Sequence, residues 1–511
     1  MTGHASTAGR TGRLIALLAT SMLAACTVGP DFSRPTVTPP PAATSTSINT
    51  DLAATRPIAA DWWKAFGDPV LDAIEQQVLA GNLDIQEAAT RVQRSRAALR
   101  IAGADLGPRA GAAASYMRER ASSKGILGLT GAEAPASDAA GGSNPFGATT
   151  LPGSNGSPAY DLFQVGVDAS WEIDLWGKNR RNREAARADA QASFYDQQAL
   201  QVSLSAEVAR VYATLRGAEA RLEVLKRNRG TVARGLEIAR QRQQQGAASQ
   251  YDAATAAAQL SAIEASIPGT VREAAAARNA LALLCGQEPH ALDTVLASTA
   301  AELVTVPDDL AGGLSSNLAR ARPDILAAEA ALHAATARIG VAKADFYPSL
   351  TLAGSFGTQA LGLSDLAGWS ARQFIVGPSL HLPIFENGRL KGQLQLVEAD
   401  QQAAAIRYRA TVLRAWHEID DALETMRAER ARYAAAQQGV EQSRIAVHVA
   451  ERRYRSGATG YNDVLIAERA ELEREVELAD ARAAHAVAVT SLYKALGGGW
   501  VPPAAPVGKS S

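Results

Sequence analysis

Few residues of this chain stand at spacings that suit catalysis or metal binding. Among 511 residues there are two cysteines and seven histidines, and the histidines lack the clustering of metal ligands. The run His-Glu-Ile-Asp-Asp, His417 to Asp421, holds metal-ligating types, but in a long helical segment we interpret it as a solvated helix face. Nucleophile-elbow, phosphate-binding and His-Glu-x-x-His motifs are missing from the sequence. We therefore predict no enzyme activity, no cofactor and no metal site.

Cys26 is the residue best placed for covalent chemistry. It closes an apolar run, Leu14 to Leu23, that follows Arg10 and Arg13, which is the pattern of a signal peptide. A run of about ten residues is too short to span a membrane, and we expect no transmembrane helix later in the chain. Leu-Ala-Ala-Cys resembles a lipobox, so we expect Cys26 to be lipidated and to begin the mature protein. The alternatives are a buried cysteine and a disulfide with Cys285.

The composition of the chain limits which partners and which kinds of secondary structure are expected. The net charge of −1 gives no electrostatic case for binding nucleic acid. Aromatic residues make up only 5% of the chain, and alanine is abundant throughout. Such a composition favours long helices in coiled-coil packing over a thick globular core.

The chain contains an internal repeat. The segment from Gly166 resembles the segment from Gly377, an offset of 377 − 166 = 211 residues, and two later pairs of segments share that offset. A Gly/Ser/Ala/Pro-rich tract, Ala121 to Pro158, reads as a loop inserted in the first copy. The expected divisions are a signal peptide (1–25), a lipidated linker (26–60), a first repeat (61–286), an equatorial connection (287–315), a second repeat (316–497) and a tail (498–511).

Each repeat carries a strand pattern. Apolar and polar residues alternate from Phe163 to Leu175 and again from Phe374 to Ile384. With shorter alternating runs before them, they predict β-hairpins at about 107–176 and about 346–386. Strands of about ten residues can cross a bilayer when tilted. The alternative is a pair of soluble hairpins on a core.

The remaining residues predict helices. Proline-free segments run from 178 to about 245 and from about 390 to 455, and the first carries a heptad stripe. A helix of some 65 residues would be about 100 Å long. Shorter helices are expected at about 250–284 and 461–496, and at about 82–105 and 324–345. Gly246 and Gly457 have the position of left-handed caps.

Four membrane strands cannot form a barrel alone, because open strand edges are not tolerated in lipid. Two copies would give eight strands, whose interior is filled by side chains. Three would give twelve, with room for a channel.

The chain resembles the TolC-like outer-membrane factors, in particular their lipidated NodT/OprM-type branch. The resemblance covers essentially the whole mature chain. It rests on CTVGPDF (26–32), DWWKAFGDPVLDAIEQQVLAGN (61–82), WEIDLWGKNR (171–180), ARPDILAAEAAL (321–332) and LYKALGGGW (492–500).

The resemblance implies an α+β membrane protein: a homotrimer with a twelve-stranded transmembrane β-barrel, four strands from each protomer, continued by a periplasmic α-helical coiled-coil barrel. It implies the exit duct of a tripartite efflux system, with a periplasmic adaptor and an inner-membrane transporter, often of the resistance-nodulation-division (RND) type, as partners. Thr27, after the cysteine, lacks the acidic side chain that favours inner-membrane retention, so we expect contact with outer-membrane lipid. A protein-secretion duct and a periplasmic coiled-coil scaffold without a pore remain alternatives.

The same resemblance implies a gate at the periplasmic helix tips. Its candidates here are Tyr454, Asp463 and, in the other copy, Asp252, while Thr459 and Ile466 replace a gate arginine and a second aspartate of the family. Six such carboxylates in a trimer would favour cations. Alternatively, each aspartate merely complements the helix dipole in a first turn. The tip turns expected to dock the adaptor contain Gly246, Gly457 and Ser456.

Overall fold

The structure is a computed structural model, and it describes residues 27–35, 59–119, 159–246, 249–297 and 322–500. The predicted signal peptide, Cys26, the loop at 121–158 and most of the connection at 287–315 lie outside the described residues.

The chain divides into two compact units, and each takes residues from both of the predicted repeats. Unit 1 comprises Met1–Phe32, Ala97–Arg187 and Ala334–Gln401, and unit 2 comprises Ser33–Arg96, Ala188–His333 and Gln402–Ser511. Unit 1 contains the four strands, and unit 2 contains the helices at Gln250–Leu284 and Tyr461–Ala495.

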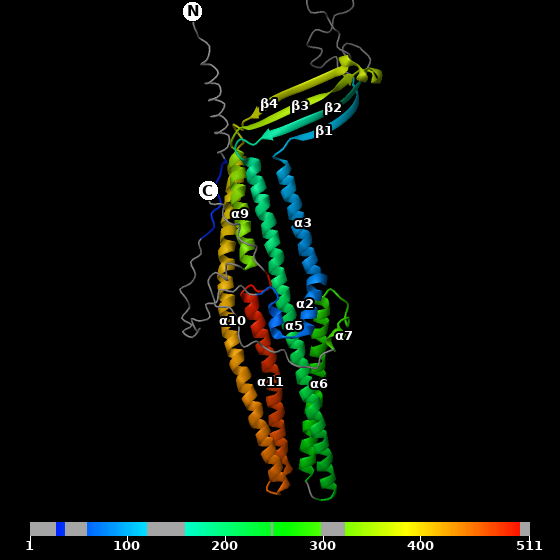
Figure 1. The fold of residues 1–511 in the computed structure, drawn as a ribbon, viewed down its shortest axis with the longest axis vertical. Helices are drawn as coiled ribbons and strands as arrows, with labels where there is room; N and C mark the ends of the chain where they lie inside the picture. The colour runs from blue at the N-terminus through cyan, green and yellow to red at the C-terminus, as the bar shows by residue number, and fades with distance from the viewer. Residues whose placement is uncertain (1–26, 36–58, 120–158, 247–248, 298–321, 501–511) are drawn as a thin grey trace, which may run out of the picture. The chain divides into compact units, whose positions relative to one another are not determined.

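The principal helices come in pairs of equal length (Figure 1). They are α3 (Leu83–Ala104) and α9 (Pro323–Ala344) with 22 residues each, α5 (Lys178–Gln244) and α10 (Arg389–Arg455) with 67 each, and α6 (Gln250–Leu284) and α11 (Tyr461–Ala495) with 35 each. The start of α5 is capped by the carboxylate of Asp174, which accepts from the backbone N–H groups of Asn179 at 3.1 Å and Arg180 at 2.9 Å. Such capping satisfies N–H groups that have no partner within the helix.

The strands form one antiparallel sheet of order β1-β2-β3-β4. Its members are β1 (Arg109–Glu119), β2 (Tyr160–Ile173), β3 (Ser349–Ala360) and β4 (Arg372–His381). Two short 3-10 helices, η3 (Leu363–Ala367) and η4 (Trp369–Ala371), join β3 to β4. Among the residues that the structure describes, no strand pairs with the outer edges of β1 and β4.

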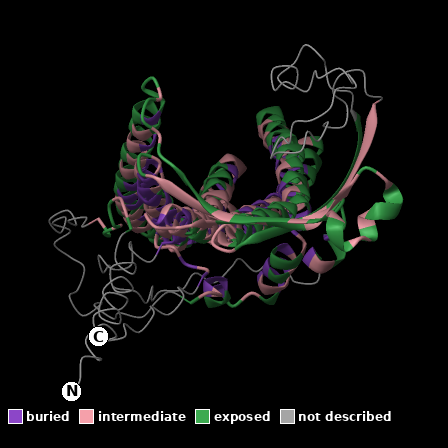
Figure 2. Ribbon diagram, turned by 90° about the horizontal axis from the view of Figure 1, so that it is seen from above, coloured by how far each residue is buried: buried purple, intermediate pink, exposed green. Residues whose placement is uncertain are grey.

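The register of the sheet separates an apolar face from a polar face. Val167 of β2 lies opposite Ala112 and Phe356, and Phe356 lies opposite Phe374. The neighbouring row is polar: Asp168 pairs with Ser355, and Glu172 with Thr351. No strand residue with a described side chain is buried, so the sheet has no core of its own (Figure 2).

Unit 2 has an apolar core around two elements that the sequence analysis did not specify, η2 (Trp62–Phe66) and α2 (Pro69–Gly81). Trp62 stacks on Tyr493 with ring centroids 4.7 Å apart. Asp68 caps α2 by accepting from Val70 N–H at 2.8 Å. A short helix, α7 (Asp293–Leu296), also contributes to this core.

Two titratable groups are enclosed in that core. Glu75 is fully buried, and neither carboxylate oxygen has a hydrogen-bond partner among the described residues. Burial therefore raises the pKa of Glu75 well above its ordinary value. Burial, with Glu75 nearby, raises the pKa of Cys285 to about 11, which leaves this thiol inert.

One helix bears on the expectation that no transmembrane helix follows the signal peptide. Among the residues that the structure describes, α9 is long and apolar enough to cross a membrane, by length and composition alone. Its most apolar stretch is 61% buried within the protein, as in the core helices of soluble proteins, so it is weak evidence for a span.

Candidate functional site

The helix tips of unit 2 contain the predicted turns. Gly246 and Gly457 have φ angles of +71° and +75°, so both adopt the left-handed conformation predicted for them. At the second tip, Gly457 N–H donates to Tyr454 O at 3.0 Å, and Ala458 N–H to Arg453 O at 2.9 Å, which completes the C-terminal cap of α10. Ser456 is exposed, and its hydroxyl donates to Arg453 O at 2.9 Å.

The two predicted aspartates occupy equivalent positions but have different surroundings. Each is the third residue of its helix, Asp252 in α6 and Asp463 in α11. Asp252 forms a capping box: its carboxylate accepts from Ser249 N–H at 3.1 Å and from the Ser249 hydroxyl at 2.9 Å. Asp463 is exposed, and no described residue donates a hydrogen bond to its carboxylate. Asp252 thus has a local role in capping its helix, beyond the helix-dipole role considered for both aspartates, whereas the Asp463 charge remains available at the tip.

Tyr454 connects the two tips. Arg242, near the end of α5, donates to the Tyr454 hydroxyl, and its guanidinium lies 4.9 Å from the centroid of that ring. Tyr454 also lies 5.2 Å, centroid to centroid, from the ring of Tyr461 at the start of α11. Arg242 thus holds the α5 tip against α10 through both a hydrogen bond and a cation–π contact.

Several glutamates of α10 and α11 lie close to the Tyr454–Tyr461 contact. Burial and the nearby carboxylates of Glu468 and Glu451 raise the pKa of Tyr461 to about 12. Burial and the like charges of Glu451 and Glu471 raise the pKa of Glu468 above its ordinary value. Glu451 is paired with Arg455 at 2.7 Å. Glu471 in turn lies 3.6 Å from Arg444, so arginines of α10 pair with two of these three carboxylates.

A second tie joins the hairpins further along the helices. Glu475 of α11 accepts from Arg227 of α5 at 2.6 Å and from Arg444 of α10 at 3.0 Å. The Glu475 side chain is 9% exposed, against 55% and 62% for the two arginines. Burial alone would raise the pKa of Glu475, but the hydrogen bonds from Arg444 and Arg227 lower it below its ordinary value. One carboxylate thus links three helices.

Apolar contacts add to the same junction. Leu236 of α5 packs with Ala256 of α6 and Leu465 of α11. Together with the Arg242 and Glu475 contacts, this cluster closes the α5/α6 hairpin onto the α10/α11 hairpin.

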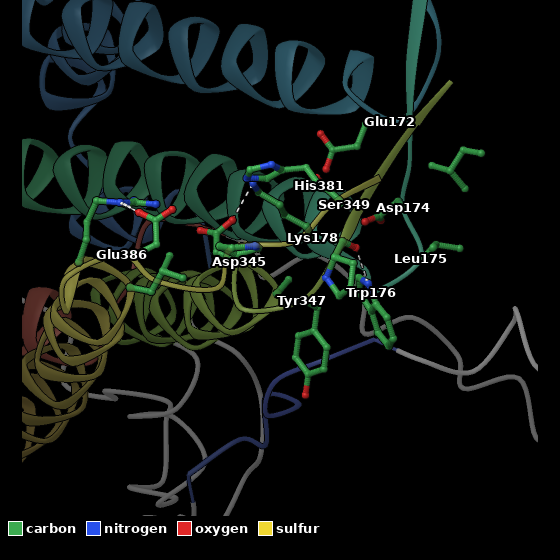
Figure 3. Close-up of a pocket in the computed structure, with 16 residues that line it drawn as sticks. Glu172, Asp174, Leu175, Trp176, Lys178, Asp345, Tyr347, Ser349, His381 and Glu386 are labelled. Carbon is green, nitrogen blue, oxygen red and sulfur yellow. Dashed lines mark hydrogen bonds and ion pairs between the residues drawn. The ribbon is translucent and has the colours of Figure 1, made fainter. Parts of the chain in front are cut away.

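In unit 1, a polar pocket lies where the strands lead into the helices (Figure 3). Lys178 pairs with Asp345 at 2.7 Å within it. Trp176 donates from Nε1 to Pro348 O at 2.8 Å and stacks on Tyr347 with centroids 4.7 Å apart. Glu172 and His381 of the polar face of the sheet also line it. The pocket thus continues the polar face with both signs of charge.

Residues 27–32, which follow Cys26, pack against the other segments of unit 1. Val28 N–H donates to Trp176 O at 3.0 Å, and Asp31 pairs with the buried Arg181 at 2.5 Å. Gly29 has a φ of +106°, and a Cβ atom there would lie 2.4 Å from Gly340 Cα. Only glycine fits this approach, so the segment from Thr27 to Phe32 has a specific binding surface.

The sequence analysis did not single out Arg242, Tyr461 or Glu475 as functional. The predicted repeat offset of 211 residues relates Arg242 to Arg453 (453 − 242 = 211), whereas the contact joins Arg242 to Tyr454. No periodic signal marks such a pair.

Known proteins share this architecture. The model of one family, described as outer membrane efflux protein, matches residues 74–287 and 314–498. The pyoverdine export outer membrane protein OpmQ of Pseudomonas putida is 32% identical over 439 residues, 86% of this chain and 88% of that protein. The outer membrane protein OprJ of Pseudomonas aeruginosa is 31% identical over 490 residues, 95% of either chain. The solved outer-membrane channel OprN is similar with a TM-score of 0.80 and 31% identity, over 93% of this chain and 100% of that one.

Proposed function

Because the chain belongs to the outer membrane efflux protein family, we propose that three copies form the exit duct of a tripartite efflux system. Four strands from each copy would close a twelve-stranded barrel, and the helices would continue the duct into the periplasm. Substrates would pass through it without chemical change, delivered by an inner-membrane transporter of the RND type and a periplasmic adaptor.

The two-faced sheet is the observation that carries this proposal. One face presents residues such as Val167, Phe356 and Phe374, and the other presents residues such as Asp168 and Glu172. An apolar outer surface around a polar interior is the pattern of a membrane barrel. The edges of β1 and β4 are open in one copy, and pairing of β1 with β4 of the next copy would remove both edges.

The helix tips supply the regulated end of the duct. In this proposal, the Arg242–Tyr454 contact holds the two hairpins of each protomer together and keeps the periplasmic aperture narrow. One Asp463 from each of three protomers would give the aperture negative charge and favour cations. The turns at Gly246, Ser456 and Gly457 would meet the adaptor.

Lipidation of Cys26 adds an anchor to this arrangement. The docked segment that begins at Thr27 supports a fixed place for the N-terminus on unit 1. A lipid there would enter the inner leaflet of the outer membrane, next to a barrel that already spans it.

Conductance in planar bilayers tests the channel and its gate together. Purified trimers should conduct, and the reversal potential in a KCl gradient should indicate preference for cations. We expect Asp463→Asn to reduce that preference, because it removes an exposed charge. The matched variant Asp252→Asn should change it less, because the Asp252 carboxylate is engaged in the capping box.

A contrary result is simple to recognise. Trimers that never conduct, even after both Asp463→Ala and Asp252→Ala, would eliminate the duct and favour a scaffold. Conduction with unchanged selectivity in the Asp463 variant would remove only the electrostatic role of that residue.

A further inference from the structure

The segment between β3 and β4 exposes an aromatic ring and a cation together. Trp369 is 80% exposed, and the guanidinium of Arg372 lies 3.6 Å from the centroid of its ring. Among the residues that the structure describes, no carboxylate pairs with Arg372. Leu363 in the same connection is 69% exposed. An apolar surface thus adjoins a positive charge that no described carboxylate neutralises.

A second pair of an aromatic ring and an arginine lies at the end of β1, and here a carboxylate pairs with the arginine. Tyr116 packs on Phe163 with centroids 4.9 Å apart, and its hydroxyl donates to Asp161 at 2.9 Å. Arg118 pairs with the same carboxylate at 3.2 Å. Tyr116 and Arg118 are among the last residues of β1, at the end of the strand that leads away from α3.

Both groups lie on the apolar face of the sheet. Arg372 shares its side of β4 with Phe374 and Val376, because alternate residues point to the same face. Arg118 shares its side of β1 with Tyr116, which lies opposite Phe163. In a barrel this face meets lipid, and the strand ends that lead away from the helices meet the outer leaflet.

Barrel closure would bring the two groups together. β1 ends at this edge and β4 begins there, so pairing of β1 with β4 of the next copy places Arg118 of one protomer near Arg372 of its neighbour. We propose that each protomer junction binds the phosphorylated headgroup of an outer-leaflet lipid between these two arginines. The site rests on the proposed trimeric barrel, and neither protomer alone completes it.

The chemistry of the site fits a phosphate carried by a lipid. Guanidinium groups bind phosphate through paired N–H donors. Tryptophan and tyrosine favour the membrane interface, where the ring is in an apolar layer and the polar atom is near the headgroups. Trp369 and Tyr116 supply these rings, and their placement beside the arginines selects a lipid over free phosphate in water.

Native mass spectrometry of purified trimers titrated with bisphosphorylated lipid A tests the site. We expect up to three lipid A molecules bound per trimer, with binding about tenfold weaker in Arg372→Gln, because one charge-assisted contact is lost per site. Arg118→Gln should have an effect in the same direction. Arg109→Gln is the matched control, since this arginine lies on β1 with the opposite parity and should leave lipid binding unchanged.

Several outcomes would overturn the proposal. Equal binding by wild type and Arg372→Gln would exclude Arg372 from the site. Equal binding of lipid A without its phosphates, or displacement by inorganic phosphate at similar concentration, would exclude recognition of a lipid phosphate. The same spectra report the trimer: a protein found only as monomer would refute barrel closure, whereas conducting trimers that bind no lipid would refute the lipid site alone.

Discussion

Replacement of Arg242 by alanine should loosen the helix tips. Arg242 connects the end of α5 to Tyr454 of α10. It donates a hydrogen bond to the Tyr454 hydroxyl and makes a cation–π contact with the ring at 4.9 Å. Alanine removes both, while Tyr454 keeps its packing on Tyr461. The helices themselves should be unaffected, because alanine is the strongest helix former.

The size of the effect follows from the exposure of the pair. A cation–π contact at an exposed site contributes about 0.5–1 kcal/mol. A hydrogen bond from a charged donor contributes about 1.5–3 kcal/mol when buried. Arg242 is exposed and Tyr454 half-buried, so we reduce the second figure to about 0.5–1 kcal/mol. The total of about 1–2 kcal/mol shifts the open–closed equilibrium of each protomer by a factor of roughly 5–30.

Single-channel recording provides the assay. Arg242→Ala should raise the fraction of time spent in open states relative to wild type. Tyr454→Phe keeps the ring and removes the hydroxyl, so it should produce an intermediate effect. Arg240→Ala is the control, because Arg240 is an exposed arginine of the same helix.

Two results would refute this reasoning. Unchanged gating in Arg242→Ala would show that the contact does not hold the tips. An equal effect of Arg240→Ala would assign the change to net positive charge rather than to the Tyr454 contact.

Three further predictions concern stability and anchoring. The pKa of Glu75 is raised above its ordinary 4.5, so the folded state binds more protons than the unfolded state. The free energy of unfolding should therefore fall as pH rises above 4.5, by up to about 1.4 kcal/mol per pH unit until the folded pKa is reached. In thermal melts, Glu75→Gln should depend less on pH than wild type and be more stable than wild type at pH 8, and an unchanged pH dependence would contradict a buried neutral acid. The pKa of Glu475 is lowered, so its contribution to stability should be present above pH 4.5 and lost as pH falls through the pKa of the folded state. Glu475→Gln should therefore reduce the free energy of unfolding by about 1–2 kcal/mol in denaturant melts at pH 7 and by little at acid pH. An equal reduction at the two pH values would show that Glu475 contributes through packing alone. Cys26→Ser behind a cleavable non-lipoprotein signal should still yield membrane-inserted trimers by gel filtration of outer-membrane extracts, and failure to insert would show that the lipid is essential.

Local sequence patterns predicted most of the secondary structure. The six principal helices begin and end within one residue of the expected positions. For the two long helices, the absence of proline marks the helix body, and the cap glycines Gly246 and Gly457 mark the ends. The four strands lie inside the expected hairpins, because one face of each is apolar. These patterns depend only on residues close in sequence, so they can be recognised without knowledge of the fold.

The contacts at the candidate site could not be predicted in this way. Arg242 meets Tyr454 across a long stretch of sequence, and nothing in the spacing of either residue marks the pair. In the sequence, Glu475 cannot be distinguished from the other acidic residues of α11. In the structure, it is enclosed and accepts hydrogen bonds from Arg227 and Arg444. For Asp252, its place in the first turn indicated a helix-dipole role, but the sequence analysis did not predict the capping box with Ser249.

The docked segment at Thr27–Phe32 also constrains how the chain folds. Val28 bonds to Trp176 in the first half, while Gly29 packs on Gly340 in the second. Its docking surface is therefore complete only after both halves have been exported and have folded against each other. Contacts so distant in sequence form late, because the intervening loop must close first. Residues near the start of the chain are thus among the last to dock, and protection of Gly29 from proteolysis would report the end of folding.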